Sequence, residues 1–170
     1  PVLVDEIVFW LRPKPHGCYV DCTIGPGGTS AGILQACGKD GRLIAIDQDP
    51  NALELARETL KPYIQNVSFH CGNFRDLRSI LDSEGVGQVD GILFDLGISS
   101  VQLADADRGF SFQQDGPLDM RMNPSLSLTA GELVNTLPET ELANVIYEFG
   151  EERLSRRIAK GIVRQRMSSP

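Results

Sequence analysis

Three glycines lie at positions where a ligand can approach the backbone closely: Gly25, Gly27 and Gly28. They follow a segment typical of a strand and precede one typical of a helix. Glycine carries no side chain to obstruct a ligand, and the first turn of a helix presents unpaired amides to it. The glycines alone therefore predict a ligand site and a tight turn that needs glycine for its backbone shape equally well.

The carboxylate of Asp47 supports the prediction of a ligand site at the glycines. Asp47 ends the next apolar segment, about twenty residues after the glycines, where an acidic side chain accepts hydrogen bonds from ribose hydroxyls. Its alternative role is to cap the following helix. Asp49 directly precedes Pro50, a residue suited to the first helical position. We therefore assign the cap to Asp49 and expect Asp47 to be free for a ribose.

The surrounding residues narrow the kind of ligand. A nicotinamide fingerprint would place glycine or alanine at Ser30, and no phosphate-loop lysine follows the glycines. A ligand with adenosine but no pyrophosphate fits better, which indicates S-adenosylmethionine. Phe74, which follows the third apolar segment, is able to pack on an adenine face. Ordinary core packing explains Phe74 equally well.

A second carboxylate, Asp95, ends the fourth apolar segment. Ligands of open α/β sheets bind beyond the carboxyl ends of the strands, so we expect Asp95 beside the methyl donor, where a substrate base enters. There it would hold the N–H groups of an exocyclic amine so that the nitrogen lone pair faces the methyl carbon. The alternative is a carboxylate that caps the next turn.

The elements that must position these residues follow from the hydrophobic pattern. Four apolar segments are typical of strands buried on both faces: residues 18–23, 42–47, 67–71 and 89–96. Helical spacing separates them, as in Leu77, Ile80 and Leu81. Alternating strands and helices predict an α/β fold with a parallel sheet and right-handed crossovers.

The pattern changes after the fourth predicted strand. Residues 97–128 are rich in Gly, Asp, Ser and Pro without a sustained period, which is typical of a long functional loop. Thr129 and Glu132 form a capping-box pattern that opens a helix. Further helices are predicted over residues 139–149 and 151–167, the latter with Leu154, Ile158 and Ile162 on one face. These elements indicate a mainly helical subdomain.

Composition bounds the class of protein. The chain has 170 residues, a formal net charge of −7, and 41% hydrophobic and 23% charged residues. These values suit a soluble globular protein, and the length allows one domain and part of a second at roughly 150 residues per domain. Four cysteines and two histidines are too scattered for a zinc site, so we expect no metal. No apolar run approaches the ~20 residues of a membrane span, and the opening residues are no signal peptide, so we expect a cytoplasmic protein.

A long motif makes the sequence recognisable. The segments Arg108-Gly109-Phe110-Ser111-Phe112 and Asp115-Gly116-Pro117-Leu118-Asp119-Met120-Arg121-Met122 closely resemble a signature of one methyltransferase family. It is the bacterial, S-adenosylmethionine-dependent MraW-type family that methylates the N4 amine of a cytosine in small-subunit (16S) ribosomal RNA. The resemblance covers nearly the whole chain, and it extends to Gly150-Glu151-Glu152-Arg153. Family members continue beyond Pro170 with further strands of the sheet, so the resemblance leaves two alternatives: this chain is a fragment, or it is a natural short form without those strands.

The resemblance implies a class I, Rossmann-like core over residues 1–104 and an incomplete loop and helical substrate-recognition insert over 105–170. The implied partner is small-subunit ribosomal RNA or the small ribosomal subunit. Asp95 would orient the cytosine amine. The implied cofactor-binding residues are Gly27, Gly28, Thr29, Asp47, Phe74, Asp95 and Gln102. The implied substrate-loop residues are Arg108, Phe110, Phe112, Asp115, Asp119 and Arg121. The chain departs from the family pattern at Pro26, Thr29 and Val101, where arginine, histidine and proline are usual.

The charge is unevenly distributed. Residues 151–170 carry a net charge of +4, and the other 150 residues carry −11. On the last predicted helix, one stripe is basic: Arg153, Arg157, Lys160 and Arg164. A solvated face is the commoner fate of such a stripe, and contact with RNA phosphates is the alternative.

Two other functions stay open at this point. The first is a methyltransferase-like module that binds RNA or the ribosome without turnover. The second is an NAD-dependent oxidoreductase, which Ser30 and the lack of a suitable proton-transfer histidine disfavour.

Overall fold

The computed structural model describes residues 3–169. Its first unit contains four parallel strands in the order β3-β2-β1-β4. The strands are β1 (Cys18–Asp21), β2 (Arg42–Asp47), β3 (Val67–Cys71) and β4 (Gly91–Leu93). Val20 pairs with Ile44 on one side and with Ile92 on the other, so β1 lies at the centre between β2 and β4. This confirms the predicted α/β class, and the strand order is that of Rossmann-like sheets.

The strands are not all buried on both faces, as the apolar runs predicted. The central strands β1 and β2 are almost wholly buried, whereas β3 is half-buried up to its last residue, Cys71, which is exposed. In β4, Ile92 keeps 39% of its surface exposed. The prediction is wrong for β3 and β4 because both lie at edges of the sheet, where fewer neighbours cover them.

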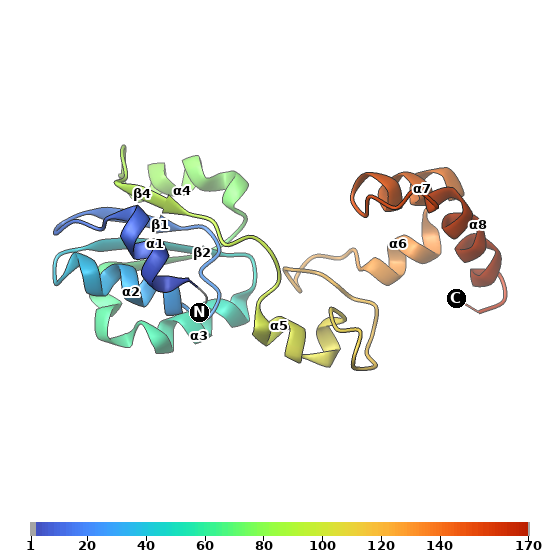
Figure 1. The fold of residues 1–170 in the computed structure, drawn as a ribbon, viewed down its shortest axis with the longest axis horizontal. Coiled ribbons are helices and arrows are strands. Elements are labelled where there is room, and N and C mark those ends of the chain that lie inside the picture. The colour runs from blue at the N-terminus through green and yellow to red at the C-terminus, as the bar shows by residue number, and fades with distance from the viewer. Residues whose placement is uncertain (1–2, 170) are drawn as a thin grey trace. The chain divides into compact units, whose positions relative to one another are not determined.

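Helices cover the two faces of the sheet (Figure 1). On one face, α2 (Gly28–Cys37) and α3 (Pro50–Thr59) pack on alternate residues of the central strands, among them Tyr19 and Leu43. On the other face, α4 (Leu77–Ser83) and the preceding turn cover Val20 and Ile44. Short 3-10 helices lead into β3 (Lys61–Asn66) and into α4 (Phe74–Asp76). The alternation of side chains along each strand thus builds two cores.

An N-terminal helix, α1 (Val4–Leu11), was not among the predicted elements. Its residues Ile7 and Leu11 pack against the α2 side of the core. Gly32 of α2 permits this approach, because a Cβ there would lie 2.7 Å from the side chain of Val4. The apolar residues of this segment, Val4, Ile7, Val8 and Leu11, recur at helical spacing, and they are the half-buried residues of the helix.

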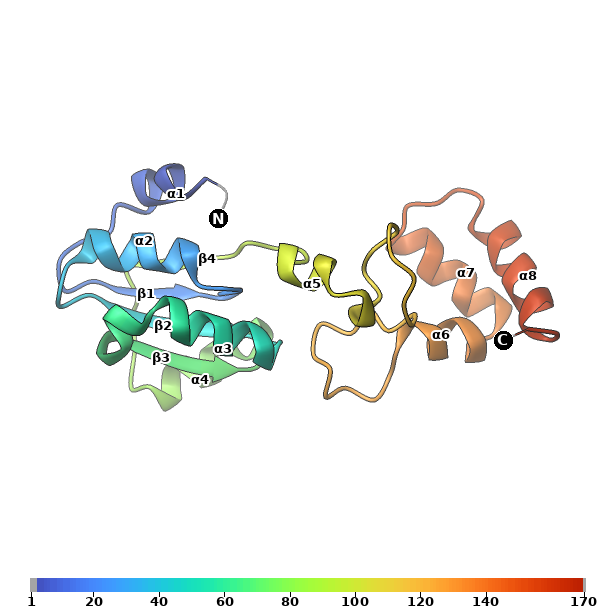
Figure 2. The ribbon, with the colours of Figure 1, turned by 90° about the horizontal axis from the view of Figure 1, so that it is seen from below.

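The second unit is mainly helical. It contains α5 (Ser100–Ala104), a 3-10 turn (Ala106–Arg108), α6 (Ala130–Thr136), α7 (Glu139–Glu148) and α8 (Ser155–Arg166). Helices α7 and α8 lie side by side (Figure 2). The predicted capping box is confirmed, since the Thr129 side chain accepts from the Glu132 amide and the Glu132 carboxylate accepts from the Thr129 amide.

The buried face of α8 differs from the predicted apolar stripe. Of the predicted stripe, Ile162 packs against the cluster between α7 and α8, whereas Leu154 and Ile158 are exposed. Ser155 and Ala159 face α7 and are buried. Small residues allow the two helices to approach closely, so Ala159 packs with Leu142 and its neighbours on α7. The contact with α7 thus overrides the hydrophobic stripe of the isolated helix.

The contacts divide the chain into units 1–97 and 98–170. The predicted functional division, 1–104 and 105–170, stays a prediction. Across residues 3–169, no helix has the length and apolar character needed to cross a bilayer.

Candidate functional site

The carboxyl end of β1 carries a buried acid. Asp21 has 2% of its surface exposed, and its two carboxylate oxygens accept from the Thr23 amide (3.1 Å) and the Ser30 hydroxyl (2.7 Å). Burial raises the pKa of Asp21 to about 6, and the nearby carboxylates of Asp47 and Asp95 act in the same direction. Asp21 was absent from the predicted site, although a carboxylate that ends a strand directly before glycines is a readable signal.

Asp47, at the end of β2, forms a hydrogen bond with the glycine loop that follows β1. Its carboxylate accepts from the Gly25 amide and from the Asp49 amide, both at 2.9 Å. The expectation that Asp47 has no structural partner is therefore wrong. Asp49 does cap α3, as predicted, because its carboxylate accepts from the Asn51 amide at 3.0 Å and Pro50 opens the helix. Each Asp47 oxygen accepts one hydrogen bond here and has capacity for a second.

The glycine loop needs glycine at two points. Gly25 and Gly27 adopt φ values of 49° and 84°, in the left-handed region. A Cβ on Gly27 would also lie 3.2 Å from the Cα of Ala56 in α3. Gly27 precedes α2, and no side chain caps that helix. Gly28 and Thr29 thus start a helix whose first amides point out from its end.

Asp95 lies just beyond β4 and is exposed. Its amide donates to the Thr23 hydroxyl at 2.8 Å, which links the carboxyl ends of β1 and β4. In the part of the chain that the structure describes, the Asp95 carboxylate accepts no hydrogen bond. The alternative that it caps the next turn is therefore not supported.

Phe74 packs as part of the core. Its ring meets Phe94 edge to face, with ring centroids 5.5 Å apart, and it contacts the cluster of Val20 and Ile44. This contact accounts for Phe74 as a packing residue. Its predicted contact with adenine stays a prediction.

Gln102 lies in the second unit and is 6% exposed. It forms a capping box with Ser99 at the start of α5: the Gln102 amide donates to the Ser99 hydroxyl (3.2 Å), and the Ser99 amide donates to the Gln102 side-chain oxygen (2.9 Å). This reciprocal pair is a structural role for Gln102. Its cofactor role stays a prediction.

The signature loop is held together by its own charged residues. The buried Arg108 guanidinium donates to the carbonyls of Arg121 (2.8 Å) and Met122 (3.1 Å). Arg121 forms a two-point contact with Asp119, at 2.9 and 2.5 Å. Hydrogen bonds from Arg121 lower the pKa of Asp119 to about 2. Three of the six predicted substrate-loop residues therefore order the loop itself.

The remaining loop residues differ in exposure. Phe110 lies 5.8 Å from the Arg108 guanidinium and is half-buried, whereas Phe112 and Asp115 are exposed. An exposed aromatic and an exposed acid remain available to a partner. Their predicted substrate contact stays a prediction.

The arrangement brings three carboxylates and the glycine loop to one edge of the sheet. Asp21, Asp47 and Asp95 follow β1, β2 and β4 at their carboxyl ends, and hydrogen bonds of the loop connect all three. Within residues 3–169, no group of three or more His, Cys, Asp or Glu side chains is arranged to hold a metal ion. The edge therefore presents carboxylate acceptors and backbone amides, which suit the hydroxyl and carboxylate groups of an organic ligand.

The family comparison agrees with the residues. Residues 1–170 match the model of the MraW methylase family. Two similar proteins are the ribosomal RNA small subunit methyltransferases H of Heliobacterium mobile, 47% identical over 100% of this chain, and of Brevibacillus brevis, 48% identical over 99%. These matches cover 55% and 54% of the relatives, so the chain spans about half the length of the curated relatives it matches.

Likeness to solved structures is partial. A S-adenosylmethionine-dependent O-methyltransferase from Thermotoga maritima is 22% identical over 45% of this chain and 29% of that chain, with a TM-score of 0.42. The assignment rests instead on the match over the full sequence, which confirms the resemblance and the class I, Rossmann-like fold predicted with it. The chain belongs to the MraW methylase family.

Proposed function

We propose that this protein takes part in S-adenosylmethionine-dependent methylation of the N4 amine of a cytosine in small-subunit (16S) ribosomal RNA. The observation that carries the proposal is the edge at which Asp47, Asp95 and the glycine loop meet. The relatives named ribosomal RNA small subunit methyltransferase H support the choice of substrate. The proposal places the protein in the cytoplasm with the small ribosomal subunit as partner, and it requires no metal.

The residues present fit the cofactor. Asp47 keeps acceptor capacity for the two ribose hydroxyls, and the uncapped start of α2 offers amides from Gly28 and Thr29. Gly27 keeps the loop close to α3, so no side chain fills the space before the helix. When bound, S-adenosylmethionine supplies an electrophilic methyl group on a sulfonium sulfur.

Asp95 is the residue proposed to act on the substrate. Its carboxylate is exposed and has no partner among the described residues, so it is able to accept an N–H of the cytosine amine. Accepting that hydrogen bond would orient the amine and favour release of its proton as the new bond forms. The Thr23–Asp95 contact fixes the backbone that carries this carboxylate.

The test is a calorimetric titration of this chain with S-adenosylmethionine. We expect saturable binding, weakened more than tenfold by Asp47→Ala, because the substitution removes acceptors for the ribose and for the loop amide. Asp40→Ala removes an exposed carboxylate of the same unit and serves as the matched control, with an affinity within about twofold of the wild type. Circular dichroism checks that both variants fold.

Equal affinity in a folded Asp47→Ala protein would remove Asp47 from the site. NADH is titrated in parallel. Binding of NADH in place of S-adenosylmethionine would show that the site belongs to an oxidoreductase, and the proposed function would be wrong.

A further inference from the structure

A cavity of about 310 Å³ opens between the end of α7 and the start of α8. This volume is in the range of small-ligand sites. Three of its lining residues are arginines and none is acidic, so the cavity favours a negatively charged ligand. The lining residues are Asn144, Tyr147, Arg153, Leu154, Ser155, Arg156 and Arg157.

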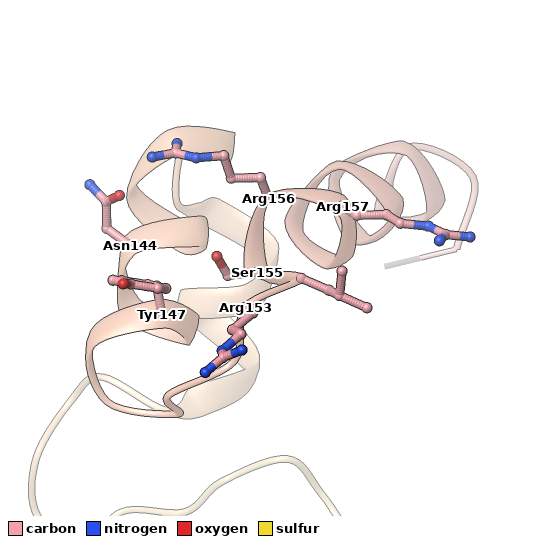
Figure 3. Close-up of a pocket in the computed structure, with 7 residues that line it drawn as sticks. Asn144, Tyr147, Arg153, Ser155, Arg156 and Arg157 are labelled. Atoms are coloured by element: carbon pink, nitrogen blue, oxygen red, sulfur yellow. The ribbon is translucent and has the colours of Figure 1, made fainter.

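Ser155 gives the cavity a polar floor. The residue is 3% exposed, and Figure 3 shows its hydroxyl pointing toward the side of α7 that carries Asn144 and Tyr147. Among residues 3–169, its hydroxyl makes no hydrogen bond, whereas its amide donates to the Glu152 carbonyl at 3.1 Å. No fully buried side-chain oxygen or nitrogen lacks a partner among the described residues, so the Ser155 hydroxyl reaches the cavity surface, where it is able to donate to a ligand oxygen.

The charge around Ser155 is positive. Ser155 is the first residue of α8, and the helix start carries partial positive charge, with no side chain of Leu154 as a cap. Arg153 and Arg156 extend on two sides of Ser155, whereas Arg157 points away from it (Figure 3). Of the nearby acids Glu148, Glu151 and Glu152, none lines the cavity, and Glu152 accepts from the Leu154 amide at 2.6 Å.

We propose that this cavity binds a phosphodiester of single-stranded RNA, between Arg153, Arg156 and the Ser155 hydroxyl. Tyr147 is 60% exposed beside the arginines and presents a ring on which a base can stack. A phosphate site next to an exposed aromatic is the arrangement by which proteins hold unpaired nucleotides, whereas an acidic peptide requires no ring. The inference rests on the proposed function, because it takes RNA as the ligand, and it names a contact separate from the methyl-transfer edge.

The test compares two double variants of equal charge change. Arg153→Gln with Arg156→Gln removes the two cations on either side of Ser155 and leaves Arg157 in place, and Lys160→Gln with Arg164→Gln removes two exposed cations of α8. Binding of a short fluorescent oligocytidylate is followed by anisotropy at several salt concentrations. We expect the cavity variant to lose about tenfold or more in affinity and the control less than threefold. The salt slope of the cavity variant should fall by about 0.7 for one lost phosphate contact.

A third variant, Ser155→Ala, tests the hydroxyl. Alanine preserves the helix, so the protein should remain folded, and RNA affinity should fall about three- to tenfold. Equal losses in the two double variants would show general attraction by charge and overturn the proposal. Displacement of the RNA by inorganic phosphate or by polyglutamate at equal anion concentration would overturn the assignment to RNA.

Titration with S-adenosylmethionine separates this inference from the proposed function. The cavity variants should bind the cofactor as the wild type does. Loss of RNA binding only in the cavity variants supports the cavity site even if the wild type fails to bind S-adenosylmethionine, which would overturn the cofactor assignment alone. Cofactor binding together with unchanged RNA affinity in the cavity variants would overturn the cavity site alone.

Discussion

Replacing Asp21 by asparagine should change how the stability of the first unit depends on pH. The Asp21 carboxyl is buried, and its pKa is raised from the ordinary value of 3.8 to about 6. Between these two values the native state holds a proton that the unfolded state has lost. The contribution of the Asp21 carboxyl to the free energy of unfolding is therefore fully present below pH 3.8 and is lost as the pH rises through about 6. Asparagine does not titrate, so the variant lacks this loss.

The size of the change in unfolding free energy follows from how far the pKa of Asp21 is raised. One pKa unit corresponds to about 1.4 kcal/mol, so the full effect is about 3 kcal/mol, of which about 2 kcal/mol falls between about pH 4.5 and about pH 7.5. Asparagine is close in shape to aspartate, and its side-chain oxygen can still accept from the Thr23 amide while its amide donates to the Ser30 oxygen. The stability of Asp21→Asn relative to the wild type should therefore rise by about 2 kcal/mol over this interval.

Urea unfolding followed by far-ultraviolet circular dichroism at several pH values measures this difference. Carboxylates shared by the two proteins titrate alike, so they largely cancel in the comparison. Asp76→Asn, at an exposed acid of the same unit, is the matched control and should give a curve parallel to the wild type. A parallel curve for Asp21→Asn would refute the inference that this carboxylate is held in a site closed to water.

Two further predictions concern the loops. Gly27→Ala should cost about 1 kcal/mol more in unfolding free energy than Gly85→Ala, because both positions have left-handed φ values (84° and 66°) but only the first would press a Cβ against α3. Urea unfolding of the two variants compares them. Arg121→Gln should raise hydrogen exchange across residues 105–131 about tenfold while α7 and α8 stay protected, because Arg121 holds Asp119 and a loop carbonyl. In the wild type, the stability that Asp119 gains from its lowered pKa is present above pH 3.8 and is lost as the pH falls through about 2. Unchanged exchange in Arg121→Gln would show that the loop does not depend on this pair.

Local patterns determined much of this protein. The bounds of β2 and β3 coincide with the predicted segments, because each is a short apolar run ended by glycine, aspartate or asparagine. The capping box at Thr129 and the cap at Asp49 were also readable, since both act within three residues. The family was predicted from a motif of contiguous residues and confirmed by the match over the full chain.

Other features depended on partners far away in the sequence. The packing of helix α1 on α2 depends on Gly32, which leaves room for Val4, and no pattern within residues 4–11 contains that information. The apolar stripe of α8 matched its buried face only at Ile162, because the small residues Ser155 and Ala159 lie where α8 approaches α7 most closely, and a hydrophobic pattern gives weight to large residues. The edge strands β3 and β4 were predicted to be buried on both faces, because an apolar run in the sequence does not show how many neighbours a strand has in the sheet.

The candidate functional site also combines features that the sequence predicts with features that depend on tertiary contacts. Residue types and spacing alone indicated a glycine loop followed by acids at strand ends, because the order of short segments along the chain determines which ends meet at one edge of a parallel sheet. Only the tertiary structure decided what each side chain does there: Asp21 is shielded from water, Asp47 holds the loop, and Arg108 orders the signature segment from within. Desolvation and hydrogen bonding depend on the atoms that surround a group in space, and folding brings those atoms together from distant parts of the chain.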